Sequence, residues 1–193
     1  MAARASSAQA NGERILEAAR DLFGEHLFDQ VSLDDVAARA QVTVRTVVRR
    51  FGSKGQLFSA VTDDRAQAIR RTRDETPVGD ITEAVRGLVA SYEEWGDVVL
   101  HMLAQERRTA AIGVLVEKGR RYHQAWVRRA FSPLLDELPK TEKRRRLAQL
   151  TAVTDIYSWK VLRRDLGLNP ADVEVSMRDL ISDIVARKQS NEV

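Results

Sequence analysis

The sequence contains no cysteine among its 193 residues. This absence excludes a disulfide framework, a thiolate metal site and a cysteine nucleophile, and it is compatible with a reducing compartment. Long apolar runs are lacking too, since no stretch approaches the roughly 18 consecutive apolar residues that a membrane span requires. The N-terminal stretch has Arg4 but no apolar run after it, so it predicts neither a signal peptide nor an anchor. We therefore expect a cytoplasmic protein with no membrane partner.

The motifs of common enzyme classes are also lacking. There is no glycine-rich phosphate loop, no HExxH and no GxSxG, and the histidines His26, His101 and His123 are scattered along the chain. His123 falls on an apolar helical stripe, where a histidine satisfied within a core is more common than a ligand or a base. The sequence thus predicts a protein that is not an enzyme and that holds no metal and no cofactor.

What the sequence does have is an excess of basic residues near its N-terminus. The net charge of +3 belongs entirely to residues 1–73, whereas residues 74–193 carry as many acidic as basic side chains. No acid occurs between Asp35 and Asp63, but five basic residues do: Arg39, Arg45, Arg49, Arg50 and Lys54. Such a basic island is the expected footprint of a phosphate-binding surface, and a solvated basic face is the alternative.

The periodicity of the apolar residues predicts helices nearly throughout. Ser32 and Asp35 have the spacing of a capping box, which begins a second helix after an amphipathic first one. Thr43 is a candidate N-cap for a short third helix, which Gly52 ends, and Ser53 opens a fourth helix. Two short helices joined by about three residues, of which the second is basic, are typical of a helix-turn-helix.

The third helix has two distinct faces when each residue turns the chain by ~100°. Val47 and Phe51 share the side that would pack on the first two helices. Arg45 and Arg49 point the opposite way, with Thr46 on one flank. Arginine can bridge O6 and N7 of guanine, and a threonine methyl can touch a thymine methyl, so this face suits a major groove. A surface helix with ordinary arginines is the alternative.

Residues Glu13 to Val61 resemble the N-terminal region of TetR-type repressors. The shared pattern is ILxAAxxLF in the first helix, SLDDVAxRAxVT through the second helix and turn, then TxxxxF, and SK ahead of the fourth helix. The resemblance implies a dimeric, all-helical regulator whose third helix enters the major groove of double-stranded DNA, with a phosphate contact from Lys54. The candidate DNA-binding residues, of which Arg50, Ser53 and Lys54 are assigned to phosphates, are Ser32, Thr43, Val44, Arg45, Thr46, Val48, Arg49, Arg50, Ser53 and Lys54.

The chain departs from the family pattern at three positions. The family usually has glycine where Gln41 stands, so either Gln41 adopts a left-handed conformation or the turn differs. Val48 replaces the usual tyrosine and removes a phosphate contact, for which Arg49 and Arg50 would compensate. Leu27 stands where glycine is common, which affects packing only.

The residues after the fourth helix carry no comparable motif. Their apolar stripes predict a helix from Ile81 to Trp95, a shorter segment from Asp97 to Arg107, and long helices over about 109–135, 140–166 and 170–187. The basic run 143–146 predicts a solvated face, with a second nucleic-acid site as the alternative. We expect an all-α fold of two domains: the helix-turn-helix in residues 1–60, and a larger helical ligand-sensing and dimerisation domain in residues 61–193.

The central helices mix apolar and polar side chains in the manner of a small-molecule pocket. His123 and Asp155 lie on or beside apolar faces, so they either satisfy one another or the backbone, or they line a cavity. In the second case the ligand is a largely hydrophobic or aromatic molecule with one hydrogen-bonding end. The candidate ligand-binding residues are Trp95, Met102, His123, Trp126, Asp155 and Trp159.

The last two long helices carry wide apolar stripes. Their pairing across two subunits would form a four-helix bundle that buries both stripes, and packing inside one subunit is the alternative. The candidate interface residues are Leu147, Leu150, Thr154, Tyr157, Val161, Val173, Met177, Leu180, Ile181 and Ile184.

Together these features predict a ligand-responsive transcriptional regulator that binds a pseudo-palindromic operator as a homodimer. A repressor released by a small-molecule inducer is favoured, because repression needs only occlusion of a promoter. The alternatives are an activator of the same type, and a helical interaction protein or enzyme that keeps a vestigial DNA-binding unit. A vestigial unit would have no reason to keep the acid-free face.

Overall fold

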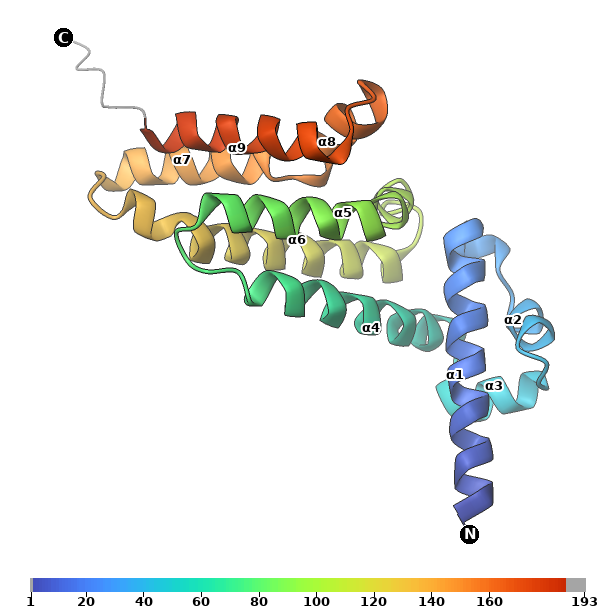
Figure 1. The fold of residues 1–193 in the computed structure, drawn as a ribbon. Coiled ribbons are helices and arrows are strands. Elements are labelled where there is room, and N and C mark those ends of the chain that lie inside the picture. Colours follow the sequence, from blue (N-terminus) through green and yellow to red (C-terminus); the bar gives the residue numbers. More distant parts are fainter. Residues whose placement is uncertain (1, 187–193) are drawn as a thin grey trace. The chain divides into compact units, whose positions relative to one another are not determined.

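The computed structural model describes residues 2–186, with the exception of the side chains of residues 2–7, 64, 65, 68 and 72. Over this range the chain is helical and contains no strand, which confirms the all-α class (Figure 1). The elements are α1 (Ala2–Glu25), η1 (Phe28–Gln30), α2 (Leu33–Arg39), α3 (Val44–Phe51), α4 (Lys54–Asp74), α5 (Ile81–Leu103), α6 (Ala110–Phe131), η2 (Ser132–Leu135), α7 (Lys140–Val153), α8 (Ile156–Lys160), η3 (Val161–Asp165) and α9 (Pro170–Ala186).

The chain divides into two compact units. Unit 1 consists of Met1–Ala68 and His101–Leu115, and unit 2 consists of Ile69–Leu100 and Val116–Val193. Unit 1 thus holds α1 to α3 and most of α4, together with the end of α5 and the beginning of α6. This division rests on compactness, whereas the boundary predicted at residue 60 concerns function and stays a prediction.

Reciprocal hydrogen bonds at the helix starts define the local structure of unit 1. Asp35 N donates to Ser32 Oγ over 3.1 Å, and Ser32 N donates to Asp35 Oδ2 over 2.8 Å. Ser53 and Gln56 make the same exchange at the start of α4. The Thr43 side chain caps α3 by accepting a backbone N–H bond. The predicted starts of α2, α3 and α4 are therefore confirmed.

An aromatic core joins α1, η1 and α4 within unit 1. The ring centroids of Phe23, Phe28 and Phe58 lie 5.0, 5.1 and 5.7 Å apart. Such pairs contribute about 0.5–1.5 kcal/mol each beyond the burial of their area. Gln105, from the turn after α5, is buried, and its Oε1 accepts from Phe28 N over 2.9 Å. Residues 101–115 therefore belong to the architecture of the N-terminal unit.

Unit 2 is a bundle with several large apolar side chains fully buried in its core. Its core includes Leu88 of α5, Phe131 of α6, Leu150 of α7, Trp159 of α8 and Met177 of α9. The burial of each such side chain contributes about 1.5–3 kcal/mol.

The helix predicted to end at Trp95 is longer, because α5 continues unbroken to Leu103. Gly96 does not interrupt it. A Cβ at this position would lie 2.5 Å from Trp159 Cζ3, so Gly96 is the point where the indole packs directly against the helix backbone.

The helix predicted over residues 140–166 is broken in the middle. α7 ends at Val153, and Asp155 begins α8 by accepting from Tyr157 N over 3.0 Å. Short polar side chains compete in this way with the helical backbone for its N–H groups. The helical period of buried residues continues across the break, since Leu150 before it, Thr154 within it and Trp159 after it are all buried. The sequence pattern therefore gave no sign of the break.

The basic run 143–146 is not uniformly solvated, so that prediction is wrong for Arg146. This side chain is 2% exposed. Its Nη1 donates to Ile184 O over 3.0 Å and to Val185 O over 2.7 Å, and its Nε donates to Glu142 Oε1 over 2.8 Å. The last carbonyls of a helix lack partners within the helix. Arg146 therefore ties α7 to the end of α9.

Two further helix ends can be compared with their predictions. α6 stops at Phe131, and Pro133 lies in the 3₁₀ turn η2, since proline has no N–H for a helical ladder. α9 begins at Pro170 with Asn169 Oδ1 accepting from Asp172 N over 3.0 Å, as predicted, and its predicted end at Arg187 lies outside the described residues. Among the helices described, none is long and apolar enough to cross a membrane.

Candidate functional site

The short helix α3 presents the two faces expected of it. Val47 is fully buried, while Arg45, Arg49 and Arg50 are exposed and Val48 is 44% exposed. The other candidate DNA-binding residues lie at the surface or partly covered: Ser32, Thr43 and Ser53 are exposed, and Val44, Thr46 and Lys54 are half-buried. The cap at Thr43 and the burial of Val47 fix the helix, so its basic side is held toward solvent.

The charges on α3 have no acidic counterpart among the described residues. Within the described part of the chain, no acidic side chain pairs with Arg45, Arg49 or Arg50. Arg39 of α2 differs, because its Nη1 lies 3.0 Å from Glu25 Oε2. Like charges on so short a helix repel one another until an anion neutralises them. The face is therefore suited to a polyanion.

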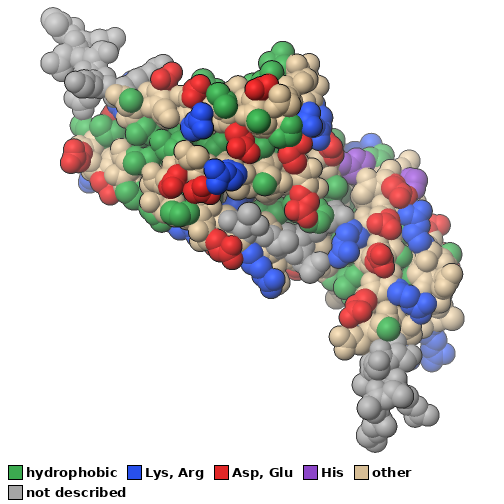
Figure 2. All heavy atoms as spheres, in the orientation of Figure 1, with side chains coloured by type: hydrophobic (Ala, Val, Ile, Leu, Met, Phe, Trp, Pro, Cys, Tyr) green, Lys and Arg blue, Asp and Glu red, His purple; other side chains and the backbone are tan. Residues whose placement is uncertain are grey.

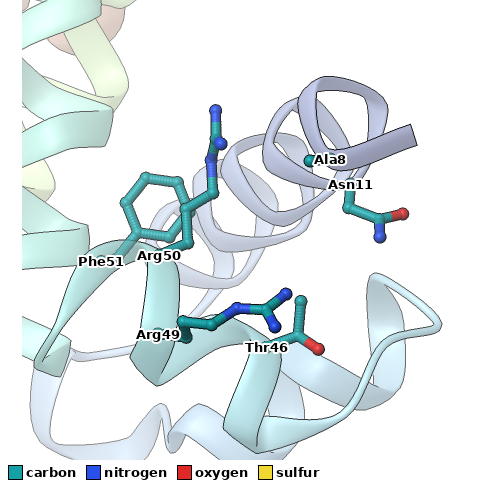
Figure 3. Close-up of a pocket in the computed structure, with 6 residues that line it drawn as sticks. All are labelled: Ala8, Asn11, Thr46, Arg49, Arg50 and Phe51. Atoms are coloured by element: carbon teal, nitrogen blue, oxygen red, sulfur yellow. The ribbon is translucent and has the colours of Figure 1, made fainter. Parts of the chain in front are cut away.

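A cavity of about 590 Å³ lies between α1 and α3. Figure 3 shows the side chains around it: Ala8 and Asn11 from α1, and Thr46, Arg49, Arg50 and Phe51 from α3. Arg50 passes directly over Gly12, where a Cβ would lie 2.5 Å from its Nε. The missing side chain at Gly12 thus allows the guanidinium of Arg50 to rest against α1.

Lys54, the first residue of α4, is held inside unit 1. Its Nζ donates to Phe28 O and to Val31 O, each over 2.9 Å, and lies 4.4 Å from the centre of the Phe28 ring. Two of the three ammonium protons are therefore engaged, and one is left for a phosphate. The phosphate contact of Lys54 stays a prediction, but the side chain also has a structural role that its position in the sequence did not reveal.

The turn before α3 is strained at one residue. Gln41 has φ 54°, the left-handed conformation that was the first of the two alternatives for this position. A side chain costs roughly 1–2 kcal/mol there, compared with a right-handed conformation. The turn therefore keeps its geometry without glycine, and α3 is placed as a glycine would place it.

Residues 15–61 match the family model described as "Bacterial regulatory proteins, tetR family". Residues 15–61 therefore form a DNA-binding region of the TetR type. The match covers α2, α3, the turn between them and parts of α1 and α4, which are the elements that hold the basic face.

Curated relatives are similar to this chain over part of its length. An HTH-type transcriptional repressor of Mycobacterium tuberculosis H37Rv is 41% identical over 69 residues, which are 36% of this chain and 37% of the relative. An HTH-type transcriptional regulator of Mycobacterium bovis gives the same values. The chain thus matches little more than a third of the length of these relatives.

Solved structures extend the likeness to the whole fold. A transcriptional regulator from Rhodococcus sp. RHA1 superposes with a TM-score of 0.68 at 18% identity, over 90% of this chain and 95% of the other. A TetR-like transcriptional regulator from the same organism has a TM-score of 0.68 at 17% identity, over 92% and 97%. The order of a helix-turn-helix followed by a larger helical domain is therefore that of known regulators.

The predicted ligand-binding residues are placed in different surroundings. His123 and Trp126 are buried with ring centroids 5.8 Å apart. Trp159 is buried beside Glu93, to which its Nε1 donates over 2.9 Å, and Trp95 is half-buried. Met102 belongs to unit 1, unlike the other candidates. Among the described residues, no group of three or more His, Asp or Glu side chains is placed to hold a metal ion.

His123 is satisfied by partners other than Asp155. Its Nε2 lies 3.2 Å from Thr154 Oγ1, and the Thr154 hydroxyl donates its proton to Leu150 O over 2.7 Å. The hydroxyl can then only accept, so Nε2 carries the proton and Nδ1 is bare. Nδ1 lies 3.4 Å from Arg73 Nη1 and accepts from it. Burial first, and then the nearby charge of Arg73, lower the pKa of His123 from 6.5 to about 4.

Arg73 is a residue that the sequence did not single out. It lies in a run of basic residues at the end of α4, which reads as a solvated face, yet it is 5% exposed and contacts His123. One signal in the sequence could have revealed it. No apolar residue follows Ile69 in α4, so a helix that remains packed beyond this point must bury a polar or charged side chain.

The predicted dimer residues separate into three groups by burial. Leu150, Thr154, Val173, Met177 and Ile181 are buried within the subunit, and Leu147 and Ile184 are half-buried. The three exposed members are Tyr157 at 53%, Val161 at 47% and Leu180 at 48%. Figure 2 shows hydrophobic side chains at the surface over α9, between acidic and basic ones. The exposed members are the ones that a second subunit could cover directly.

Proposed function

We propose that this TetR-family protein regulates transcription as a homodimer. It binds a pseudo-palindromic operator in double-stranded DNA through residues 1–60 and responds to a small molecule bound by residues 61–193. The observation that carries the proposal is the exposed face of α3, where Arg45 and Arg49 have no acidic partner among the described residues. A folding role would not require two guanidinium groups to stay exposed and unpaired on a helix held by a cap and a buried valine.

Arg45 and Arg49 are proposed to contact bases, whereas the polar groups around them are proposed to contact phosphates. Arg45 and Arg49 read base edges in the major groove, where an arginine can bridge O6 and N7 of guanine. Arg50, Ser53 and the remaining proton of Lys54 bind phosphates, together with the backbone amides at the start of α4. Val48 offers no hydroxyl, so Arg50 supplies the phosphate contact on that side.

The test begins with selection of a DNA site from a random library, followed by titration of the best site. Arg45→Ala or Arg49→Ala weakens binding by about 1–3 kcal/mol and relaxes the preference at one base pair. Lys54→Ala weakens all DNA about equally and flattens the dependence of affinity on salt. Arg144→Ala, an exposed position in unit 2, is the matched control and binds as the parent does. Equal binding by all four variants would remove α3 from the interface.

A dimer is required because one short helix contacts too few base pairs for specificity. We assign its interface to α8, η3 and α9. The exposed apolar side chains Tyr157, Val161 and Leu180 form the part of the interface that is free on a single subunit. Leu180→Asp yields monomers by light scattering, and Val78→Asp, at a comparably exposed valine before α5, leaves the dimer intact. A dimer that survives Leu180→Asp would place the interface elsewhere.

The direction of regulation is proposed as repression in the cytoplasm, with release by the ligand. Repression requires only that the bound dimer occlude a promoter, and one of the curated relatives is named a repressor. A ligand shifts the equilibrium only by its different affinities for the two forms, so ligand and operator must weaken each other to the same extent. A ligand that strengthens operator binding would instead identify an activator or a corepressed repressor.

A further inference from the structure

A buried arginine without an acidic partner lies in unit 2. Arg73, near the end of α4, is 5% exposed. No acidic side chain of the described residues lies within 4.0 Å of its guanidinium, and its Nε has no hydrogen-bond partner. Burial of an unpaired charge is costly unless further hydrogen bonds or a counter-ion compensate it. Its contacts to two neutral side chains, His123 Nδ1 at 3.4 Å and Tyr92, are weak compensation for a full charge.

Two acidic residues near Arg73, its neighbour Asp74 and Asp155, which acts on the same His123, are committed to other groups. Asp74 accepts from Arg129 Nη1 over 2.8 Å and from Tyr122 OH over 3.3 Å. Asp155 accepts from the backbone N–H of Tyr157 at the start of α8. His123 carries no charge at neutral pH, since its pKa is about 4. The positive charge of Arg73 is therefore not neutralised by direct contact with any acidic side chain that the structure describes.

Two aromatic rings flank the guanidinium. Arg73 Cζ lies 5.2 Å from the centre of the Tyr92 ring and 5.3 Å from that of Trp126. Trp126 is 2% exposed, and its Nε1 is a second buried donor without a partner. Two unpaired donors thus belong to side chains that touch each other. Arg129 Nη2 donates to Arg73 O over 2.6 Å and fixes the backbone that carries the first of them.

We propose that Arg73 anchors a carboxylate site in unit 2, and that the effector is an aromatic acid. The planar guanidinium matches the two oxygens of a carboxylate, and a charge-assisted bond of this kind is about twice as strong as a neutral one. The indole N–H of Trp126 supplies another donor, and the rings of Tyr92 and Trp126 supply faces for an aromatic body. This inference rests on the proposed function, because it names the ligand class of the regulator.

A purely structural Arg73 makes a different prediction. Contacts of a cation with two aromatic rings stabilise a fold without any ligand. In that case aromatic acids and their neutral amides would bind unit 2 equally or not at all. The contrast between an acid and its amide therefore separates a ligand anchor from a structural cation, because the two compounds have nearly the same shape.

The experiment uses the full chain and three pairs of compounds: benzoate, 3-phenylpropionate and 2-naphthoate, each with its primary amide. Calorimetry measures binding to the parent, to Arg73→Met and to Arg71→Met, an exposed arginine two residues earlier that serves as the control. At least one acid binds the parent at least about 10-fold more tightly than its amide. Arg73→Met loses this preference and Arg71→Met keeps it.

A second measurement avoids any variant that fails to fold. The Nε–H resonance of Arg73 in the parent moves downfield when the acid is added, because the proton enters a charge-assisted bond, and it stays in place with the amide. Equal affinity of all three acids and their amides, or an unmoved resonance with a bound acid, would overturn the carboxylate site. Operator binding is measured on the same samples. Arg73→Met binds operator DNA as the parent does, so loss of the acid preference and loss of DNA binding are separate results.

Discussion

Unit 1 and unit 2 use the same residue type in opposite ways. In unit 1 the core is apolar and aromatic, and Arg45 and Arg49 stay exposed and unpaired among the described residues. In unit 2 Arg73 and Arg146 are 5% and 2% exposed and lie between helices. An arginine directed outward is available to a partner, whereas an arginine directed inward fixes the positions of the helices around it. Whether the guanidinium is exposed or buried therefore distinguishes a binding arginine from a structural one.

Lys54 is the intermediate case. Its half-buried ammonium bonds the carbonyls of Phe28 and Val31 within unit 1, as Arg146 bonds the carbonyls at the end of α9 within unit 2. Both side chains donate to backbone oxygens of other elements, although Phe28 O also accepts from Val31 N. Lys54 differs because its third ammonium proton is proposed to bind a DNA phosphate.

The largest change in the free energy of unfolding is expected from Arg146→Met, which removes a buried arginine of unit 2. The change removes the donor from Ile184 O and Val185 O and leaves Glu142, a partly covered carboxylate, with Arg145 alone. Loss of one partner from a buried charged network lowers the free energy of unfolding by about 3 kcal/mol. Trp95, Trp126 and Trp159 all belong to unit 2, so tryptophan fluorescence during denaturant unfolding reports on this unit.

Arg145→Met is the matched control for that experiment, because the Arg145 side chain is 68% exposed. It should shift the midpoint of unfolding by less than about 0.5 kcal/mol. Equal destabilisation by the two variants would mean that burial of Arg146 does not matter and that the contrast between the units is not energetic.

Acid is expected to destabilise unit 2 through His123. The pKa of this residue is 6.5 when unfolded and about 4 in the fold, because burial and the charge of Arg73 disfavour the imidazolium. Between these values the unfolded chain binds the proton and the folded chain does not. The stability of unit 2 is therefore complete above pH 6.5 and declines as the pH falls toward 4, by up to about 3 kcal/mol.

His123→Asn isolates this contribution, since asparagine does not titrate. The difference in free energy of unfolding between parent and variant, followed by tryptophan fluorescence, should change with pH between 6.5 and 4 and be constant above 6.5. A difference that is constant from pH 8 to pH 4 would show that His123 does not titrate in this window.

Two helical glycines of unit 2 differ in their surroundings, since Gly96 faces a close neighbour and Gly119 faces open space. In unit 2, Gly96→Ala drives a methyl group into the buried indole of Trp159, which fills its site and cannot move away. We expect unfolding to become easier by about 1–3 kcal/mol. Gly119→Ala in α6 has nothing within 4 Å and should stabilise by about 0.5–1 kcal/mol, as alanine does in an open helix. Stabilisation by both changes would contradict the close packing at Gly96.

The smallest effect on stability is expected from Gly12→Ala in unit 1. The new methyl group meets the far end of Arg50, which can move, so the free energy of unfolding changes by less than about 1 kcal/mol. The displaced guanidinium weakens operator binding by less than about tenfold, measured by fluorescence anisotropy. Loss of stability without any change in DNA affinity would show that Arg50 is a packing residue, as the arginines of unit 2 are.

Local hydrogen-bond chemistry was predictable from the sequence, because its partners are three residues apart. Ser32, Thr43, Ser53 and Asn169 begin helices as their spacing indicated. Long-range contacts were not predictable. The partners of Lys54 lie 23 and 26 residues away, and those of Arg146 lie 38 and 39 residues away.

The break after α7 was missed for a related reason. Thr154 and Asp155 can each continue a helix or compete with it, and the period of the apolar residues is the same in both cases. Arg73 was missed because its neighbours Arg70 and Arg71 are exposed, and only packing in three dimensions distinguishes it from them. The three helix starts that position the basic face were thus accessible, whereas the surroundings of the candidate ligand-binding residues were not.

The membership of residues 101–115 in unit 1 limits how such a regulator can be recombined with others. A chimera that joins residues 1–60 to a foreign sensor would leave Phe28 N without Gln105 Oε1, and His26 O without the ring nitrogen of His101 that lies 3.1 Å from it. A graft that preserves these bonds must carry both segments of unit 1. Its splice points then fall inside α4, α5 and α6 rather than in loops. The exchangeable module is discontinuous in the gene, so shuffling at a single crossover would separate parts that fold together.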